Sequence, residues 1–161
     1  MDRMAVVLDD KLADLDRWVP GNRCSIVRAL DVVGTKTAML IMRESMYGTT
    51  RFDGFARRVG VSDAVAAARL KALVAEGLLE KSPYQEPGQR TRFEYRLTEK
   101  GADLVPVLFG LMQWGDKYCQ PKGAPLEMVS DKTGAPVQVT VSTADGVEVP
   151  LDELRISLVK R

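Results

Sequence analysis

Hydrophobic side chains recur every three to four residues through the first half of the chain, and most of these repeats end at glycine. This spacing is typical of amphipathic helices that bury one face. Thr35 and Ser62 stand where their side chains can cap the first turn of a helix, and Gly77 suits the residue after a helix end. The pattern predicts helices over residues 4–19, 25–33, 36–47, 52–59 and 63–76.

After Gly77 the pattern changes from helical spacing to alternation. Residues 78–84 and 92–97 alternate apolar and polar positions on either side of a turn-rich Gln-Glu-Pro-Gly-Gln segment, which predicts a β-hairpin. A helix capped by Thr98 is expected to continue to about Tyr118 and to bend at Pro106. Further on, valines alternate before and after an Asp-Gly turn, so we expect a small β appendage over residues 125–161.

The order of these elements indicates a fold. Successive helices, a tight Gly60-Val61-Ser62 turn before the helix at 63–76 and a two-stranded hairpin are the layout of a winged helix-turn-helix. The fold class is therefore α+β and mainly α. Helical periodicity also predicts that Arg69 points inward, between Val65 and Leu73.

Composition narrows the function. The chain of 161 residues has no histidine and two cysteines, which excludes Ser-His-Asp and Cys-His catalysis, histidine metal ligands and cysteine-rich zinc sites. The acid pairs Asp9-Asp10 and Asp152-Glu153 do not converge on one site and are interpreted as solvated surface. We expect no catalytic residue, no metal and no cofactor. Few cysteines, no signal-peptide core and no apolar run of membrane-spanning length indicate a cytoplasmic protein that does not enter membranes.

The net charge of +1 hides an uneven distribution. Residues 51–100, which hold the predicted helix-turn-helix and hairpin, contain ten basic and seven acidic residues, whereas residues 101–161 contain six basic and eight acidic residues. The basic surplus therefore lies on the half of the chain with the winged-helix pattern.

From about residue 24 to 119 the chain resembles the HxlR-type winged-helix transcription regulators, which are relatives of the MarR group. The resemblance rests on the order and spacing of several short segments: Cys24-Ser-Ile-Val-Arg-Ala-Leu-Asp-Val-Val-Gly34, Leu40-Ile-Met-Arg-Glu44, Arg51-Phe52-Asp-Gly-Phe55, Val61-Ser62, Arg69-Leu70-Lys-Ala-Leu73, Glu76-Gly77-Leu78, Phe93-Glu-Tyr95-Arg-Leu97-Thr98-Glu-Lys-Gly101 and Leu104-Val-Pro-Val-Leu108 through Trp114-Gly115.

This resemblance implies a homodimer that presents two recognition helices to a pseudo-palindromic operator in double-stranded DNA. It divides the chain into an N-terminal dimerisation helix at residues 1–23, a winged-helix DNA-binding domain with a C-terminal dimerisation helix at 24–119, and a β-rich extension at 120–161. The chain departs from the family at Thr37, where an aromatic residue is usual. It also departs on the outer face of the recognition helix, where long polar residues are usual.

The candidate DNA contacts fall into three groups. The recognition helix and its cap offer few groups that reach base edges, since alanine gives only apolar contact to a thymine methyl. Arginines around the preceding helix suit phosphates, and arginines of the wing suit a narrow minor groove, so DNA shape would contribute to specificity. The candidates are Ser62, Asp63, Ala64, Ala67, Ala68 and Lys71 on the recognition helix, Arg51, Arg57 and Arg58 before it, and Arg90 and Arg92 in the wing.

Two kinds of signal suit this sequence, because a chain without histidine cannot use an imidazole as a switch. Cys24 stands where some members of the family carry a redox-sensing thiol, and Arg23 and Arg28 could favour its thiolate; the alternative is a small buried side chain. A small apolar effector is the other candidate, in a pocket formed by Met39, Met42, Met46, Phe109, Met112 and Trp114. Methionines at helical spacing also suit an ordinary core.

The leading hypothesis is a homodimeric, sequence-specific DNA-binding transcription regulator that acts as a repressor. The alternative is a winged-helix module that binds protein, or a ligand- or redox-sensing protein with weak DNA binding. The poor direct readout of the recognition helix and the β appendage favour this alternative.

Overall fold

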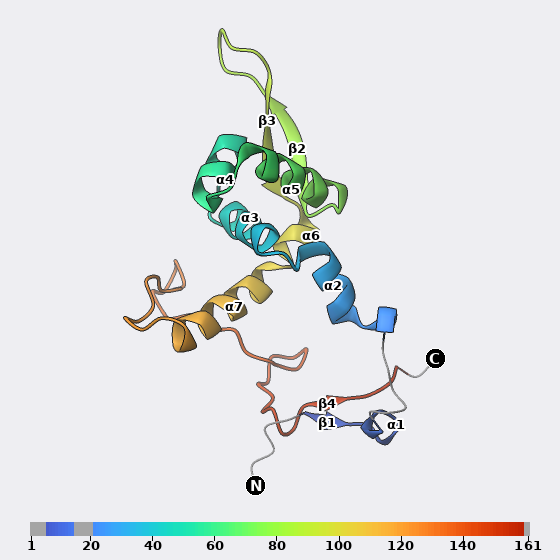
Figure 1. The fold of residues 1–161 in the computed structure, drawn as a ribbon. Coiled ribbons are helices and arrows are strands. Elements are labelled where there is room, and N and C mark those ends of the chain that lie inside the picture. The colour runs from blue at the N-terminus through green and yellow to red at the C-terminus, as the bar shows by residue number, and fades with distance from the viewer. Residues whose placement is uncertain (1–5, 15–20, 160–161) are drawn as a thin grey trace.

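The computed structural model describes residues 6–14 and 21–159. It is a mainly helical α+β protein in which a two-stranded wing and the helix Val105–Tyr118 lie on opposite sides of a helical body (Figure 1). None of the described helices is both long enough and apolar enough to cross a membrane. The elements of the winged-helix part are η1 (Gly21–Arg23), α2 (Ser25–Val33), α3 (Lys36–Met46), α4 (Phe52–Val59), α5 (Asp63–Ala75), β2 (Leu79–Tyr84), β3 (Arg92–Leu97), α6 (Glu99–Ala102) and α7 (Val105–Tyr118).

One hydrophobic core joins all of these elements except η1 and α6. Helix α3 lies at its centre with Ile41 and Met42 fully buried, and Phe55 of α4 packs edge-on against Tyr95 of β3 with ring centroids 6.2 Å apart. Leu70 is among the residues that α5 contributes to the same cluster. Because α3, α4, α5 and the wing share one core, the helix-turn-helix and the wing have a fixed relative position.

The predicted helix ends in this part are confirmed. The Thr35 hydroxyl accepts a hydrogen bond from the backbone N–H of Ala38 at 3.2 Å, and the Ser62 hydroxyl accepts one from Val65 at 3.3 Å. Gly60 ends α4 with a φ of +73°, which only glycine adopts without strain, so the chain can reverse within the short turn before α5. Residues 25–33 and 52–59 form helices with the predicted bounds.

The helix predicted from Thr98 to Tyr118 is two helices. Thr98 caps the first, since its hydroxyl accepts from the N–H of Gly101 at 3.1 Å, but the chain leaves the helix at Asp103 and starts α7 at Val105. Pro106 lies in the first turn of α7, where a missing N–H costs nothing. Proline therefore begins a new helix here and does not bend a continuous one.

The predicted N-terminal helix is wrong for the residues that the structure describes. Val7–Leu8 form a short strand, β1, that pairs in parallel with β4 (Arg155–Ile156), and only Asp10–Ala13 form a helical turn, α1. The backbone N–H of Val7 donates to Leu154 at 2.8 Å, a partner that spacing within residues 4–19 cannot reveal. The rest of the predicted helix, residues 4–5 and 15–19, lies outside the described part.

The β appendage is less regular than its alternation of valines predicts. The turn at Asp145-Gly146 is present, with a backbone hydrogen bond from Val149 to Val141 at 2.9 Å, yet Ser142 and Glu148 form only an isolated bridge. Most of these residues are exposed, and a two-stranded hairpin without a cover is marginal in water. Gln113 of α7 holds the segment by accepting a hydrogen bond from Val139 at 2.9 Å and donating one to Val137 at 3.0 Å.

Two glycines give a matched test of this packing. A Cβ at Gly101 would lie 2.1 Å from the carbonyl oxygen of Leu78, whereas a Cβ at Gly115 of α7 would meet no atom within 4 Å. We expect Gly101→Ala to lower the free energy of unfolding by about 2 kcal/mol, because backbone must move to admit the methyl group. Gly115→Ala is expected to raise it by up to about 1 kcal/mol. Urea denaturation of both variants checks this, and equal midpoints would contradict the close approach of α6 to Leu78.

Candidate nucleic-acid interface

Helix α5 has one face in the core and one face in solvent. It buries Ala66, Leu70 and Leu73, so positions on the opposite side of the helix point outward. The structure places all six sequence candidates of this helix and its cap on the surface; we call them the outward face of α5: Ser62, Asp63, Ala64, Ala67, Ala68 and Lys71.

Sequence periodicity assigned Val65 to the wrong side of α5, whereas Arg69 lies partly buried at the edge of the core face. Val65 is 45% exposed, because the core uses Ala66, one position further along. Val65 therefore flanks the outward face and adds a second kind of apolar group suited to thymine methyls. Alanine suits a core position as well as a surface position. Placing Ala66 in the core would have shown that Val65 lies on the surface.

Arg90 and Arg92 lie at the tip and the outer end of the wing. Both are exposed, and within the described ranges neither forms an ion pair. Gly88 turns the hairpin tip with a φ of +74°. By contrast, Arg96 on the same strand pairs with Glu94 at 2.9 Å. The two predicted wing arginines thus keep their charges available to a partner.

Arg51 connects α4 to the wing. Its guanidinium forms an ion pair with Glu86 at 2.8 Å and lies 4.6 Å from the centroid of the Tyr84 ring. The side chain is about half exposed, so one side of the guanidinium faces solvent. Arg51 therefore links the start of α4 to the outer end of the wing.

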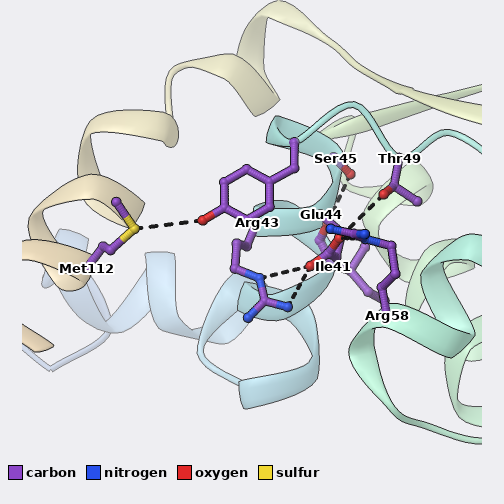
Figure 2. A network of polar contacts seen from close by, with 8 residues as sticks. Ile41, Arg43, Glu44, Ser45, Thr49, Arg58 and Met112 are labelled. Carbon is purple, nitrogen blue, oxygen red and sulfur yellow. Dashed lines mark hydrogen bonds and ion pairs between the residues drawn. The ribbon is translucent and has the colours of Figure 1, made fainter. Parts of the chain in front are cut away.

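Arg57 and Arg58 are neighbours with different surroundings. Arg57 is exposed and has no ion-pair partner among the residues described. Arg58 donates from Nε to Oε2 of Glu44, a carboxylate on α3 that is only 2% exposed (Figure 2). The geometry thus gives Arg58 a structural contact between α3 and α4, which sequence reasoning missed because Glu44 lies among apolar core positions.

Glu44 has a second cation partner. Arg43 donates to Oε1 of Glu44 from Nε at 3.0 Å and from its terminal nitrogen at 2.6 Å, so the two arginines approach the carboxylate from two sides (Figure 2). Burial raises the pKa of Glu44, but the hydrogen bonds from Arg58 and Arg43 and their charges outweigh burial and hold that pKa below its usual range. We call these three residues the Glu44 triad.

The lowered pKa of Glu44 predicts how the stability of the fold depends on pH. A carboxyl whose pKa is lower in the folded chain stabilises the fold above its unfolded pKa of about 4.3, and this contribution disappears as pH falls through the folded pKa. We therefore expect Glu44→Gln to be less stable than wild type at neutral pH and to approach wild-type stability as pH falls below that unfolded value and through the lower folded pKa. Urea midpoints across this range test the sign, with the exposed Glu127→Gln as control. A stability difference that grows on acidification would contradict it.

A groove between α5 and the wing holds two lysines. It is lined by Ala67 and Lys71 of the outward face and by Lys81 of β2, whose ammonium lies 4.2 Å from the centroid of the Phe93 ring. Sequence reasoning did not select Lys81. Lys81 lies two residues after the buried Leu79, on the strand next to α5. This position could be recognised only from the strand register, which pairs Lys81 with Tyr95.

Helix α7 carries an apolar stripe with no cover in the monomer. Its members follow each other at helical spacing and each is more than half exposed: Val107, Leu111, Trp114 and Tyr118. Ile26 and Leu30 of α2 are exposed to a similar degree. Apolar area of this kind in a single chain marks a surface that another molecule covers.

The two cysteines are free thiols at helix ends. Cys24 is the half-buried residue before the first turn of α2, and Cys119 is exposed at the end of α7. The side chain of Cys24 makes no capping hydrogen bond. Nothing in this geometry tests a redox role for Cys24, which stays a prediction. Groups of three or more Asp, Glu or Cys side chains placed to hold a metal ion are absent from the described part of the chain.

A tight helix-turn-helix followed by a two-stranded hairpin that packs against its second helix defines a winged helix-turn-helix protein. The HxlR-like helix-turn-helix model matches residues 32–123, and the chain belongs to this family. The predicted resemblance and fold class are thereby confirmed.

Proteins similar to this chain in sequence carry the names of transcription regulators. The chain is 42% identical to the uncharacterized HTH-type transcriptional regulator Rv3095 of Mycobacterium tuberculosis over 118 residues, which are 73% of this chain and 72% of the relative. An uncharacterized HTH-type transcriptional regulator of Methanothermobacter thermautotrophicus is 32% identical over 59% of this chain and 72% of its own length.

Two solved structures of related proteins are similar to this chain. PA1607, a candidate transcription factor, matches with a TM-score of 0.74 and 35% identity over 86% of this chain and 96% of its own. The redox regulator HypR in its reduced form matches with a TM-score of 0.55 and 26% identity over 60% of this chain and 95% of its own. The match to PA1607 covers more of the chain than the family model does, so part of the flanking segments is shared too.

Proposed function

We propose that this protein is a homodimeric, sequence-specific DNA-binding transcription regulator that acts as a repressor in the cytoplasm. The observation that carries the proposal is the exposed outward face of α5, which includes Lys71 and has Lys81 in the groove beside it. Arg57 of α4 and the wing residues Arg90 and Arg92 are also exposed, and none of the three forms an ion pair with a residue that the structure describes. A helix of this kind fits the major groove, and cations on either side of it contact phosphates. We propose no catalytic role, since the chain has no histidine and its charged groups suit binding.

Each group has a part in this binding. Asp63, Ala64, Ala67, Ala68 and Val65 bring short side chains close to base edges, so that methyl groups and Ser62 read the sequence at close range. Lys71, Arg51 and Arg57 contact phosphates and fix the register on the duplex. Arg90 and Arg92 enter the adjacent minor groove, where a narrow groove attracts arginine. Arg58 adds to the phosphate contacts from the half of its side chain that is exposed.

The apolar stripe on α7 supports the dimer. A second copy that covers Val107 and Trp114 would remove them from water, and Ile26 of α2 extends the same kind of surface. A two-fold dimer presents two copies of α5 to successive major grooves, about 34 Å apart, so its operator is an inverted repeat. Occupying such a site beside a promoter excludes the polymerase, which gives repression.

Selection of bound sequences from a random pool of duplexes tests this function. We expect the selected sequences to share two inverted half-sites with centres about one helical turn apart. Enrichment of a single unrepeated site would remove the dimer from the proposal. A pool that shows no enrichment over the starting sequences would contradict sequence-specific binding.

The alanines of α5 favour one rival, a winged-helix module that binds protein. Four of the residues on or beside the outward face have side chains too short for bidentate base contacts: Ala64, Ala67, Ala68 and Ala72. If the protein is such a module, binding to its partner does not depend on the wing arginines Arg90 and Arg92. The selection experiment separates the two, because a protein-binding module enriches no DNA sequence.

A further inference from the structure

An apolar pocket of about 150 Å³ lies between α3 and α7. Leu40 and Met46 of α3 form one wall, and Leu108 and Met112 of α7 form the other. The residues that line this pocket differ in part from those of the effector site predicted from the sequence. Met39 also lines it together with Met46 and Met112, but Met42 is fully buried in the core, and neither Phe109 nor Trp114 is among the lining residues.

The polar side chains in the lining are those of Arg43 and Tyr47. The Tyr47 hydroxyl donates to the sulfur of Met112 at 3.8 Å, a weak bond that a better acceptor can replace. Arg43 is about one-third exposed and shares Glu44 with Arg58. Arg43 is the charged residue in the pocket lining, and because it shares the single Glu44 carboxylate with Arg58, its positive charge is only partly compensated.

We propose that this pocket binds a small amphipathic anion, an apolar ring or short chain that carries one carboxylate. A cavity of about 150 Å³ has room for a benzene ring, and the apolar walls match such a body. The carboxylate accepts hydrogen bonds from Arg43 and from the Tyr47 hydroxyl. Arg43 selects an anion here and disfavours a neutral apolar molecule. Leu111 of the apolar stripe on α7 also lines the pocket.

The Glu44 triad connects this pocket to the helix-turn-helix (Figure 2). A ligand carboxylate competes with Glu44 for Arg43, and Glu44 then depends on Arg58 of α4 for its compensation. Arg58 is held more firmly to the protein and is less available to phosphate. Binding of the anion is therefore expected to weaken operator binding, a consequence that rests on the proposed function.

Titration calorimetry without DNA tests the site. The probes are 4-tert-butylbenzoate and the neutral 4-tert-butylbenzamide, which have nearly the same shape and differ in charge. We expect the acid to bind once per chain and about tenfold or more tighter than the amide, as a charged hydrogen bond allows. Equal affinities, or no binding of the acid, would overturn the proposal.

Three variants locate the binding. Arg43→Gln is expected to remove the preference for the acid, and Met46→Phe, which fills the pocket, to remove binding of both probes. Lys36→Gln takes a charge from an exposed position on the same helix and should leave both affinities unchanged. Circular dichroism confirms the fold of each variant. Should Arg43→Gln lose its fold, Met46→Phe alone decides, and undiminished binding of the acid by Met46→Phe overturns the site.

Operator affinity with and without saturating acid tests the coupling. We expect the acid to weaken operator binding by about fivefold or more in wild type and to have no effect in Met46→Phe. If the acid binds but the chain enriches no DNA sequence, the proposed function fails and the pocket stands. If the operator is bound specifically and the acid does not bind, the pocket fails and the proposed function stands.

Discussion

The double variant Val107→Glu, Trp114→Glu is expected to be a monomer in solution and to bind its operator at least about 100-fold more weakly than wild type. Both side chains belong to the apolar stripe of α7 and are more than half exposed in one chain. Carboxylates at these positions would be desolvated and unpaired in a dimer interface, and tryptophan often carries a large share of interface energy. Loss of the second half-site accounts for the fall in affinity, because bivalent binding commonly gains a factor of about 100 or more.

Sedimentation velocity at micromolar concentration measures the dimer, and fluorescence anisotropy measures DNA binding. Lys36→Glu is the control, since it makes the same change in net charge at an exposed position of α3. It should stay a dimer with nearly unchanged affinity. Retention of the dimer and of full operator affinity in the double variant would contradict the role of the stripe.

The second large effect concerns the wing. Arg90→Ala, Arg92→Ala is expected to weaken binding to operator and unrelated DNA by a similar factor, about tenfold to 100-fold at low salt. The loss of two cations from the minor groove, where they lie close to phosphates of both strands, releases fewer counterions and should reduce the slope of log affinity against log salt by about 2. Arg96→Ala is the matched control, because Arg96 lies on the same strand but pairs with Glu94 at 2.9 Å. If affinity and salt slope stay at wild-type values in the double variant, the wing does not contact DNA.

Local signals were enough to predict the middle of the fold. Caps such as Thr35 and Ser62 and the glycine at position 60 act within a few residues of themselves, so the sequence contains the whole interaction. The ends of the chain depend on distant partners. Val7 pairs with a segment almost 150 residues away, and no periodicity within residues 4–19 distinguishes that strand from a helix.

In the candidate site, too, the sequence predicts residues whose positions depend on local geometry and misses those that depend on distant partners. The positions of Lys71 and Arg90 on the surface follow from helical and hairpin geometry, and the sequence predicts both. The role of Arg58 could not be predicted, because it depends on a buried carboxylate that reaches it from another helix. Lys81 was missed for a similar reason, since its position beside Lys71 needs the packing of the hairpin against α5.

Recognition of a specific DNA sequence by this chain is tested most directly by a salt-titrated anisotropy measurement. The probes are the duplex upstream of the protein's own gene and a scrambled duplex of the same composition. We expect the upstream duplex to bind about 1,000-fold or more tighter at physiological salt, as one dimer per site, with a complex that survives excess competitor. Equal affinity for the two duplexes at every salt concentration would contradict such recognition.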